Sequence, residues 1–167
     1  MQKRLYSLAA IFALSLMVFI SIPFPQDKII EVEYTQLTSE ARKQVDCLAD
    51  NIYYEAGFEP QNGRVAVGLV TLNRVQDPRY PKDICSVVKQ KVKSTCQFSW
   101  FCMTIGNKNN KAYQEAREVA LYVYANYEKI KDVTEGALFY HADYVNPRWK
   151  LERTVVIGRH IFYKEKD

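Results

Sequence analysis

The stretch NIYYEAGFEP, residues 51–60, closes an amphipathic helix and carries a glutamate at its end. From Ser39 onward, apolar residues recur at helical spacing, namely Ala41, Val45, Leu48, Ile52 and Ala56. Glu55 follows Ile52 by three positions, so it lies on the same apolar stripe. Gly57 and Pro60 then break the pattern within one turn. The sequence therefore predicts a helix that aims Glu55 inward, at a point where packing ends and a cleft can begin.

Glu55 is the candidate acid of a catalytic site, because desolvation at such a position raises the pKa of a carboxyl group towards that of a general acid. A surface role is the alternative, in which Glu55 extends from the helix edge or pairs with a cation such as Arg64. Glu59 is a second candidate acid, but Pro60 removes it from helical geometry. Capping of the next helix is the simpler interpretation of Glu59.

The amino-terminal region predicts a membrane anchor. Residues 5–24 contain no charged side chain and follow Lys3 and Arg4; at ~1.5 Å per residue a helix of this length spans ~30 Å, about one bilayer core. We expect an uncleaved inner-membrane anchor over residues 1–25, a linker over 26–38, and a domain over 39–167 outside the cytoplasm, in the periplasm or cell wall. A cleaved signal peptide, followed by secretion, is the alternative, although no small-x-small site precedes Gln26.

Four cysteines form an even set, as expected in an oxidising compartment: Cys47, Cys85, Cys96 and Cys102. We favour the pairs Cys47–Cys85 and Cys96–Cys102, although the sequence alone leaves three pairings open. There is no Cys-x-x-Cys pair, and His141 and His160 are the only histidines, so we expect no metal and no cofactor. A zinc amidase would need more histidines, and a cysteine peptidase built on Cys102 and His141 would need a free thiol.

Charge and size exclude some classes of protein. The net charge is +4; removing Lys3 and Arg4 from the 23 basic residues leaves 21 against 19 acidic residues, which is too mild a surplus for a nucleic-acid partner. The 12 Tyr and 8 Phe suit sugar stacking, but core packing explains most of them. About 140 exported residues make one domain with a real core, and we expect a monomer.

The rest of the pattern predicts an α+β fold. Helices are expected from about residue 60 or 61 to 75 and from about 110 to 130, with a short helical turn through Val87 and Val88 and a loop region over 91–110. Two segments rich in β-branched and aromatic residues, ALFYHADYV (137–145) and TVVIGRHIFY (154–163), are expected to pair as a hairpin. The predicted architecture is mainly α, of the lysozyme-like sort, with a small antiparallel hairpin or sheet near the carboxyl terminus.

Six blocks of sequence occur in a specific order between Cys47 and Tyr163: CLADNIYYEAGFEP, AVGLVTLNRV, ICSVV, QFSW, ALFYHADYVNPRW and IGRHIFY. With these blocks the chain resembles the SleB/CwlJ-type cell-wall hydrolases, which include spore cortex-lytic enzymes and related bacterial and phage proteins. The resemblance implies a fold like that of resuscitation-promoting factors and lytic transglycosylases. It implies peptidoglycan as partner and Glu55 as the catalytic acid.

The resemblance also implies substrate contacts. Gln97, Ser99 and Trp100 of the QFSW block would bind and stack on sugar, although Trp100 filling the core beside a disulfide explains that residue equally well. We expect Tyr140, His141 and Tyr144 to line the cleft opposite Glu55, with a structural histidine as the alternative for His141. His160 is assigned to the sheet.

The chain departs from the family pattern within its first block. Where the family reads Glu-Ala-Arg-Gly-Glu-Pro, this chain has Glu55, Ala56, Gly57, Phe58, Glu59 and Pro60. We expect cleavage of the bond between N-acetylmuramic acid and N-acetylglucosamine by a lytic transglycosylase that uses Glu55 alone, in wall remodelling or in lysis by a host or phage endolysin. A hydrolytic muramidase and a membrane-tethered, non-enzymatic peptidoglycan-binding module are the alternatives.

Overall fold

The computed structural model describes residues 29–104 and 106–166. Helix α1 (Ser39–Ala56) begins after Thr38, whose hydroxyl accepts the backbone N–H of Ala41 at 3.2 Å, and it ends before Gly57. The helix thus covers the predicted range. Glu55 occupies its last turn, as the sequence predicts.

Three further helices pack with α1. Helix α2 (Gln61–Gln76) confirms the predicted central helix, and α3 (Ile84–Val88) is capped by the Asp83 carboxylate, which accepts the N–H of Ser86. Helix α4 (Asn110–Asn126) ends four residues earlier than expected. The N–H groups of Lys129 and Ile130 both bond to the Asn126 carbonyl, so the chain closes in a turn there. The segments η1 (Tyr34–Gln36) and η2 (Ser99–Cys102) are short 3-10 helices.

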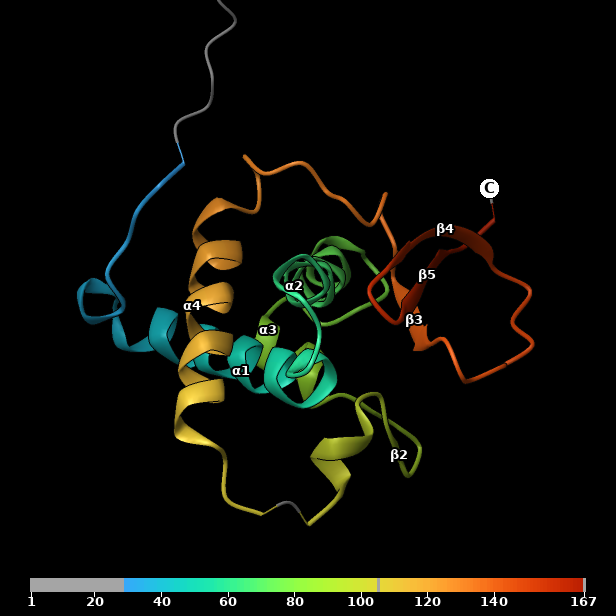
Figure 1. Cartoon of the computed structure of the whole chain (residues 1–167), viewed down its shortest axis with the longest axis horizontal. Coiled ribbons are helices and arrows are strands. Elements are labelled where there is room, and N and C mark those ends of the chain that lie inside the picture. The colour runs from blue at the N-terminus through green and yellow to red at the C-terminus, as the bar shows by residue number, and fades with distance from the viewer. Residues whose placement is uncertain (1–28, 105, 167) are drawn as a thin grey trace, which may run out of the picture.

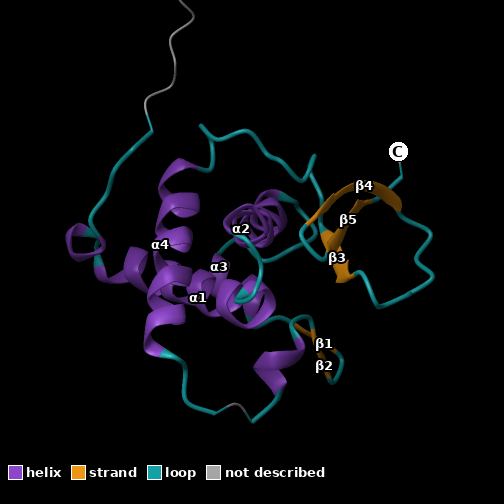
Figure 2. Ribbon diagram, viewed as in Figure 1, coloured by secondary structure: helices purple, strands orange, loops and turns teal. Residues whose placement is uncertain are grey.

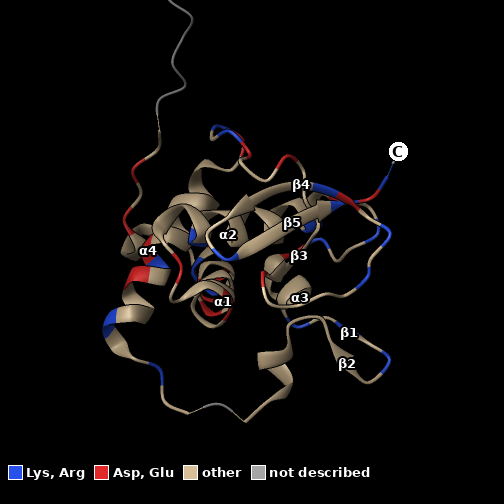
Figure 3. Cartoon of the chain, turned by 45° about the vertical axis from the view of Figure 1, so that its right-hand side comes forward, with Lys and Arg blue, Asp and Glu red and all other residues tan. Residues whose placement is uncertain are grey.

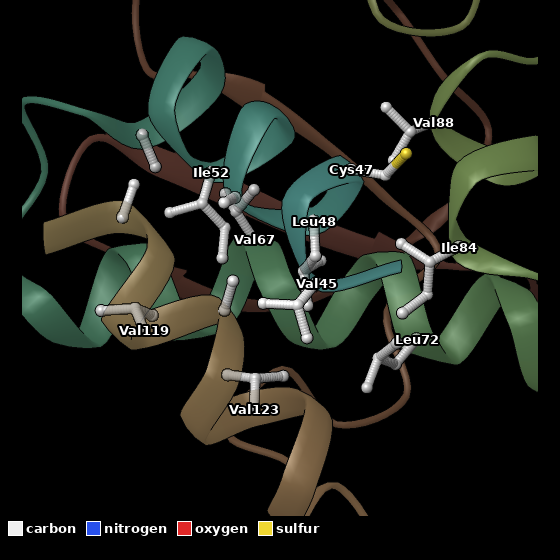
Figure 4. Packing of buried hydrophobic residues seen from close by; sticks show 14 of the residues in the cluster. Val45, Cys47, Leu48, Ile52, Val67, Leu72, Ile84, Val88, Val119 and Val123 are labelled. Atoms are coloured by element: carbon white, nitrogen blue, oxygen red, sulfur yellow. The ribbon is translucent and has the colours of Figure 1, made fainter. Parts of the chain in front are cut away.

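The core lies between these helices. Side chains from α1, α2, α3 and α4 meet in one buried cluster, in which Ile52 and Leu48 of α1 lie against Val67 of α2 (Figure 4). Gly68 leaves room for this packing, since an added Cβ there would lie 3.3 Å from Ile52 and 3.4 Å from Val123. The apolar stripe read from the sequence is therefore the face by which α1 is buried, and it fixes the direction of Glu55.

A three-stranded antiparallel sheet lies on the opposite side of the helices from α4 (Figures 1 and 2). Its order is β3 (Phe139–Ala142), β5 (His160–Lys164) and β4 (Glu152–Ile157), with β5 in the centre. A smaller hairpin pairs β1 (Lys91–Val92) with β2 (Thr95–Cys96) within the expected loop region. Phe162, Ala66, Val70, Ala137 and Ile157 form a second buried cluster, which joins the sheet to α2.

The predicted hairpin between residues 137–145 and 154–163 is wrong in detail. The second segment folds back on itself at Gly158, which has a φ of +59°, so β4 and β5 form the hairpin and β3 pairs with β5. A tight turn with positive φ favours glycine, and that signal was present in the sequence. The small antiparallel sheet itself is as predicted.

The structure contains two disulfides, Cys47–Cys85 and Cys96–Cys102, which is the pairing favoured from the sequence. The first joins α1 to α3, and the second closes the η2 loop. Because Cys102 is bonded to Cys96, it offers no thiol for the cysteine-peptidase alternative.

Loss of the Cys47–Cys85 disulfide is expected to lower stability more than loss of Cys96–Cys102. The sequence separations are 38 and 6 residues, and closure of the longer loop removes more entropy from the unfolded chain. We expect the double alanine variant at Cys47 and Cys85 to lose up to about 4 kcal/mol, and the variant at Cys96 and Cys102 to lose about 2 kcal/mol. Denaturant unfolding of both variants measures this, and a larger loss for the short loop would contradict the expectation.

The anchor predicted over residues 5–24 lies outside the described residues. Among residues 29–104 and 106–166, no helix is long and apolar enough to cross a membrane.

Candidate active site

Glu55 and Tyr140 meet where α1 faces the sheet. The Tyr140 hydroxyl donates a hydrogen bond to Glu55 Oε2 at 3.2 Å, across 85 positions of sequence. Within the described part of the chain, Tyr140 is the one side chain that hydrogen-bonds to Glu55. The contact fixes one carboxyl oxygen and leaves Oε1 for a second partner.

Burial raises the pKa of Glu55 above its ordinary value. The hydrogen bond from Tyr140 and the positive charge of Arg74 act in the opposite direction, because both stabilise the ionised carboxylate. Glu55 is therefore held in an environment that favours the protonated acid and can still accommodate the negative charge once the proton has left.

Tyr140 is a suitable partner for this acid. Its ring lies between α1 and the inner face of the sheet, against His160 at 5.2 Å and Phe162 at 5.7 Å between ring centroids. Burial, followed by the nearby charge of Glu55, raises the pKa of Tyr140 well above its ordinary value. The phenol therefore stays protonated and donates. Tyr140 faces Glu55, as the sequence analysis expected.

A pair of stacked aromatic rings lies at the same turn of α1 as Glu55. Trp100 stacks on Tyr54 with ring centroids 4.7 Å apart, and its indole N–H donates to the Asn51 side-chain oxygen at 3.2 Å. Asn51 is fully buried and donates to the Thr71 hydroxyl at 3.1 Å. Trp100 also packs against the helical core, as its structural alternative expects, and its contact with sugar stays a prediction. Asn51 lies one turn before Glu55, so the network holds the indole near the acid.

The other predicted contact residues differ in their surroundings. Gln97 is exposed on the loop before η2, and Ser99 is exposed at the first position of η2, so their contact with substrate stays a prediction. His141 alternates with Tyr140 along β3, and its Nε2 lies 3.0 Å from the Tyr163 hydroxyl. Its ring stacks on Tyr163 and meets Trp149 edge-on, so His141 belongs to an aromatic cluster on the outer face of the sheet. The expectation that His141 lines the cleft opposite Glu55 is therefore not met by its contacts, which support the structural alternative.

Tyr144 is exposed on the loop after β3, where its ring faces the Arg159 guanidinium at 5.5 Å. In Figure 3 the ribbon is blue at Lys and Arg residues in this loop between β3 and β4 and in the β1–β2 hairpin. They include Arg148 and Lys150 in the first and Lys91 and Lys93 in the second, all exposed.

The contacts of Arg64 and Glu59 decide between the remaining interpretations of the segment around Glu55. Arg64 donates to Glu115 Oε2 at 3.1 Å and to the Gly57 carbonyl at 3.0 Å, so it is not the partner of Glu55. Glu59 does not cap α2, because its carboxylate accepts the backbone N–H of Arg159 at 2.9 Å instead. Glu59 thereby ties the α1–α2 junction to the β4–β5 turn, where Gly158 leaves room for the carboxylate.

Two residues around Glu55 were not among the predicted site residues. Asn51 is a polar residue on the buried side of α1, four positions before Glu55, and that interruption of the stripe was the available signal. Arg74 is buried in the last turn of α2, and no local pattern shows that it lies near Glu55.

Two other features lie away from this site. A cavity of about 520 Å³ opens at the opposite end of α1, where its lining includes Glu40, Gln44 and Leu72. Among the residues that the structure describes, no group of three or more His, Cys, Asp or Glu side chains is placed to hold a metal ion.

Comparisons with known proteins agree with the fold. A family model described as "Cell Wall Hydrolase" matches residues 58–163, a range that begins three positions after Glu55. The spore cortex-lytic enzyme of Bacillus subtilis (strain 168) is 29% identical over 125 residues, which cover 73% of this chain and 38% of that protein. The spore cortex-lytic enzyme of Halalkalibacterium halodurans is 27% identical over 121 residues, which cover 71% of this chain and 34% of that protein. The chain thus spans little more than a third of the length of these relatives.

Two solved structures are similar. The catalytic domain of the germination-specific lytic transglycosylase SleB from Bacillus anthracis superposes with a TM-score of 0.55 at 25% identity, covering 77% of this chain and 98% of that domain. The catalytic domain of Bacillus cereus SleB gives a TM-score of 0.53 at 23% identity, and the match covers 77% of this chain and 94% of that domain. These similarities confirm the predicted lysozyme-like α+β fold and the resemblance read from the six blocks.

Proposed function

Because the chain belongs to the cell wall hydrolase family, we propose that it cleaves the glycan strand of peptidoglycan between N-acetylmuramic acid and N-acetylglucosamine, with Glu55 as the catalytic acid. The observation that carries the proposal is the contact between Glu55 and Tyr140, in which a half-buried carboxyl with a raised pKa keeps one oxygen free. The similarity to a lytic transglycosylase catalytic domain supports this reaction class. We further propose that the domain acts outside the cytoplasm, on the cell wall.

Glu55 acts first as an acid. Its carboxyl proton passes to the bridging oxygen as the bond from that oxygen to C1 of the muramic acid breaks, and N-acetylglucosamine leaves with a free hydroxyl. The pKa of Glu55 matters here, because only the protonated acid can begin the step. The positive charge that develops at C1 is balanced by the ionised Glu55 and by the sugar's own acetamido group.

Glu55 then acts as a base. The C6 hydroxyl of the same muramic acid attacks C1, and its proton returns to the Glu55 carboxylate, which leaves a 1,6-anhydro ring and the enzyme in its starting form. No second protein carboxylate and no water take part. Tyr140 donates to Glu55 Oε2 throughout, which keeps the carboxyl pointed at the bond.

Exposed Lys and Arg residues in the β3–β4 loop and the β1–β2 hairpin suit this substrate, since the stem peptides of peptidoglycan carry carboxylates (Figure 3). The stacked Tyr54 and Trp100 beside Glu55 offer an aromatic surface for a sugar ring.

Digestion of purified peptidoglycan with the full chain tests the proposal. We expect soluble glycan fragments whose muramic ends are blocked, with no new free amino groups. Release of new amino groups would identify a peptide-bond-cleaving enzyme, and binding to the wall without release would identify a non-enzymatic module. Either result would overturn the proposal.

Phe58 is expected to contribute to substrate binding, in a position where the family usually has glycine. The Glu59 N–H donates to the Ala56 carbonyl at 3.0 Å, so the chain continues the helical turn and the fully exposed Phe58 ring follows Glu55 by three positions. Arg64 holds this junction through the Gly57 and Glu59 carbonyls. An exposed ring about one turn after the acid can stack on a sugar.

We expect Phe58→Ala to raise KM for soluble glycan fragments about 2- to 10-fold while kcat changes little. The matched control is Tyr122→Ala, which removes an exposed ring from α4, away from Glu55 and the sheet (Figure 1). An unchanged KM in Phe58→Ala, or an equal rise in the control, would refute the role.

A further inference from the structure

Arg74 is a buried cation that the mechanism above does not use directly. It lies in the last turn of α2 with 5% of its surface exposed. Three aromatic rings surround its guanidinium, with centroids 5.2 Å away for Phe98, 5.5 Å for Tyr80 and 6.0 Å for Phe139. Arginine is rarely buried without a partner that balances its charge, so its place in the fold calls for a functional reason.

The hydrogen bonds of Arg74 lead to Tyr140. Its Nε–H donates to the Leu138 carbonyl at 2.8 Å, two positions before Tyr140 on the segment that becomes β3. The neighbouring Asn73 donates to the Ala137 carbonyl at 3.1 Å, and Asn73 is itself held by the Tyr127 hydroxyl at 2.8 Å. Hydrogen bonds from the end of α2 therefore hold the chain directly before β3, the strand that presents Tyr140 to Glu55.

Within the described residues, no ion pair balances the charge of Arg74, and its Nη1 nitrogen is buried without a hydrogen-bond partner. Its charge favours the ionised form of Glu55 and of Tyr140, the two side chains that share a hydrogen bond. A buried positive charge close to an acid, but not bonded to it, stabilises the anion without removing the proton beforehand.

We propose that Arg74 is a positioning residue for the Glu55 site: it holds the strand that presents Tyr140 and supplies the buried positive charge that balances Glu55 when the carboxyl is ionised. This inference rests on the proposed function for its catalytic meaning. The arrangement of Arg74, Tyr140 and Glu55 can also be tested without turnover.

Two groups act directly on Glu55, and two further titratable side chains lie on the neighbouring elements. Tyr140 from β3 donates to it, and Arg74 approaches from α2. His160 of β5 touches the Tyr140 ring, and burial lowers its pKa, which favours the neutral imidazole. Glu59 at the α1–α2 junction is engaged with the Arg159 backbone. Arg74 is therefore the group whose positive charge stabilises the ionised Glu55 carboxylate.

Two substitutions separate the positive charge of Arg74 from its hydrogen bond to the Leu138 carbonyl. Arg74→Gln keeps a side-chain donor for the Leu138 carbonyl but removes the charge, and Arg74→Lys keeps the charge but loses the planar fork. Their effect is measured by NMR titration of isotope-labelled glutamate carboxyls in the full chain, with the Glu55 signal assigned from Glu55→Gln. The same variants are assayed for release of glycan fragments across pH.

We expect the Glu55 signal of Arg74→Gln to titrate at higher pH than in the wild type, since loss of a nearby positive charge favours the protonated carboxyl. The alkaline limb of its activity should move the same way, with kcat about tenfold lower or more. Arg74→Lys should titrate as the wild type does. The matched control is Arg79→Gln, because Arg79 is a surface arginine that pairs with Asp77 and Glu165 and should leave the titration unchanged.

Each variant alone can overturn the inference. A wild-type titration of Glu55 in folded Arg74→Gln would show that the charge has no role. A titration displaced to higher pH in Arg74→Lys, despite the retained charge, would show the same. If the wild type titrates as described but cleaves no glycan, the proposed function fails while the arrangement of Arg74 and Glu55 stands.

Discussion

Glu55→Gln is expected to lower the rate of glycan release by about 100- to 10,000-fold, the range for loss of a positioned general acid. Glutamine has nearly the same shape and can still accept the Tyr140 hydrogen bond, so the site keeps its geometry but has no proton to give. Release of soluble fragments from purified peptidoglycan measures the effect. The thermal midpoint should stay within a few degrees of the wild type, because no apolar contact is removed.

The matched control is Glu59→Gln, four positions along the same segment. Its amide oxygen can still accept the Arg159 N–H that Glu59 holds at 2.9 Å, so both fold and activity should be retained. Substantial activity in Glu55→Gln, or an equal loss in Glu59→Gln, would remove Glu55 from its role as the acid.

Phe162→Ala is expected to have the largest effect on stability among single substitutions of the sheet. Phe162 is fully buried on β5 and fills the cluster that joins the sheet to Ala66 and Val70 of α2. Truncation of a buried phenylalanine leaves a cavity and costs about 3–5 kcal/mol. A domain of this size has about 5–15 kcal/mol in total, so the loss is a large part of its stability.

This substitution should also lower activity, since Phe162 packs against the ring of Tyr140 at 5.7 Å and helps to aim its hydroxyl at Glu55. Denaturant unfolding measures the first effect and glycan release at low temperature the second. The matched control is Phe58→Ala, the same change at a fully exposed ring, which should alter stability by about 0.5 kcal/mol or less. Equal stability losses at the two positions would contradict the packing described for Phe162.

The position of Glu55 could be predicted from local sequence because one helix determines it. The apolar stripe of α1 is buried as the spacing of Val45, Leu48 and Ile52 requires, and the helix ends before Gly57. Helical period and a glycine stop are local signals, so they need no knowledge of the tertiary structure. The family resemblance added the fold and the reaction class, which periodicity does not specify.

The partners of Glu55 could not be predicted in the same way, since they come from distant segments. Tyr140 and His141 are neighbours in the sequence, yet they lie on opposite faces of β3, and only the register with Phe162 and Tyr163 decides which one faces the acid. Arg74 reaches the site through the Leu138 carbonyl, 64 positions away. Such pairings depend on how the sheet docks on α2, which no local pattern records.

The most direct test of the account is mass spectrometry of the fragments that the full chain releases from peptidoglycan in water labelled with heavy oxygen. If Glu55 returns a proton from the muramic C6 hydroxyl to complete the cycle, the new ends will be 1,6-anhydro sugars without the label, and Glu55→Gln will release none. Reducing ends that each carry one heavy oxygen atom would mean that water attacks C1, and the intramolecular mechanism would then be wrong.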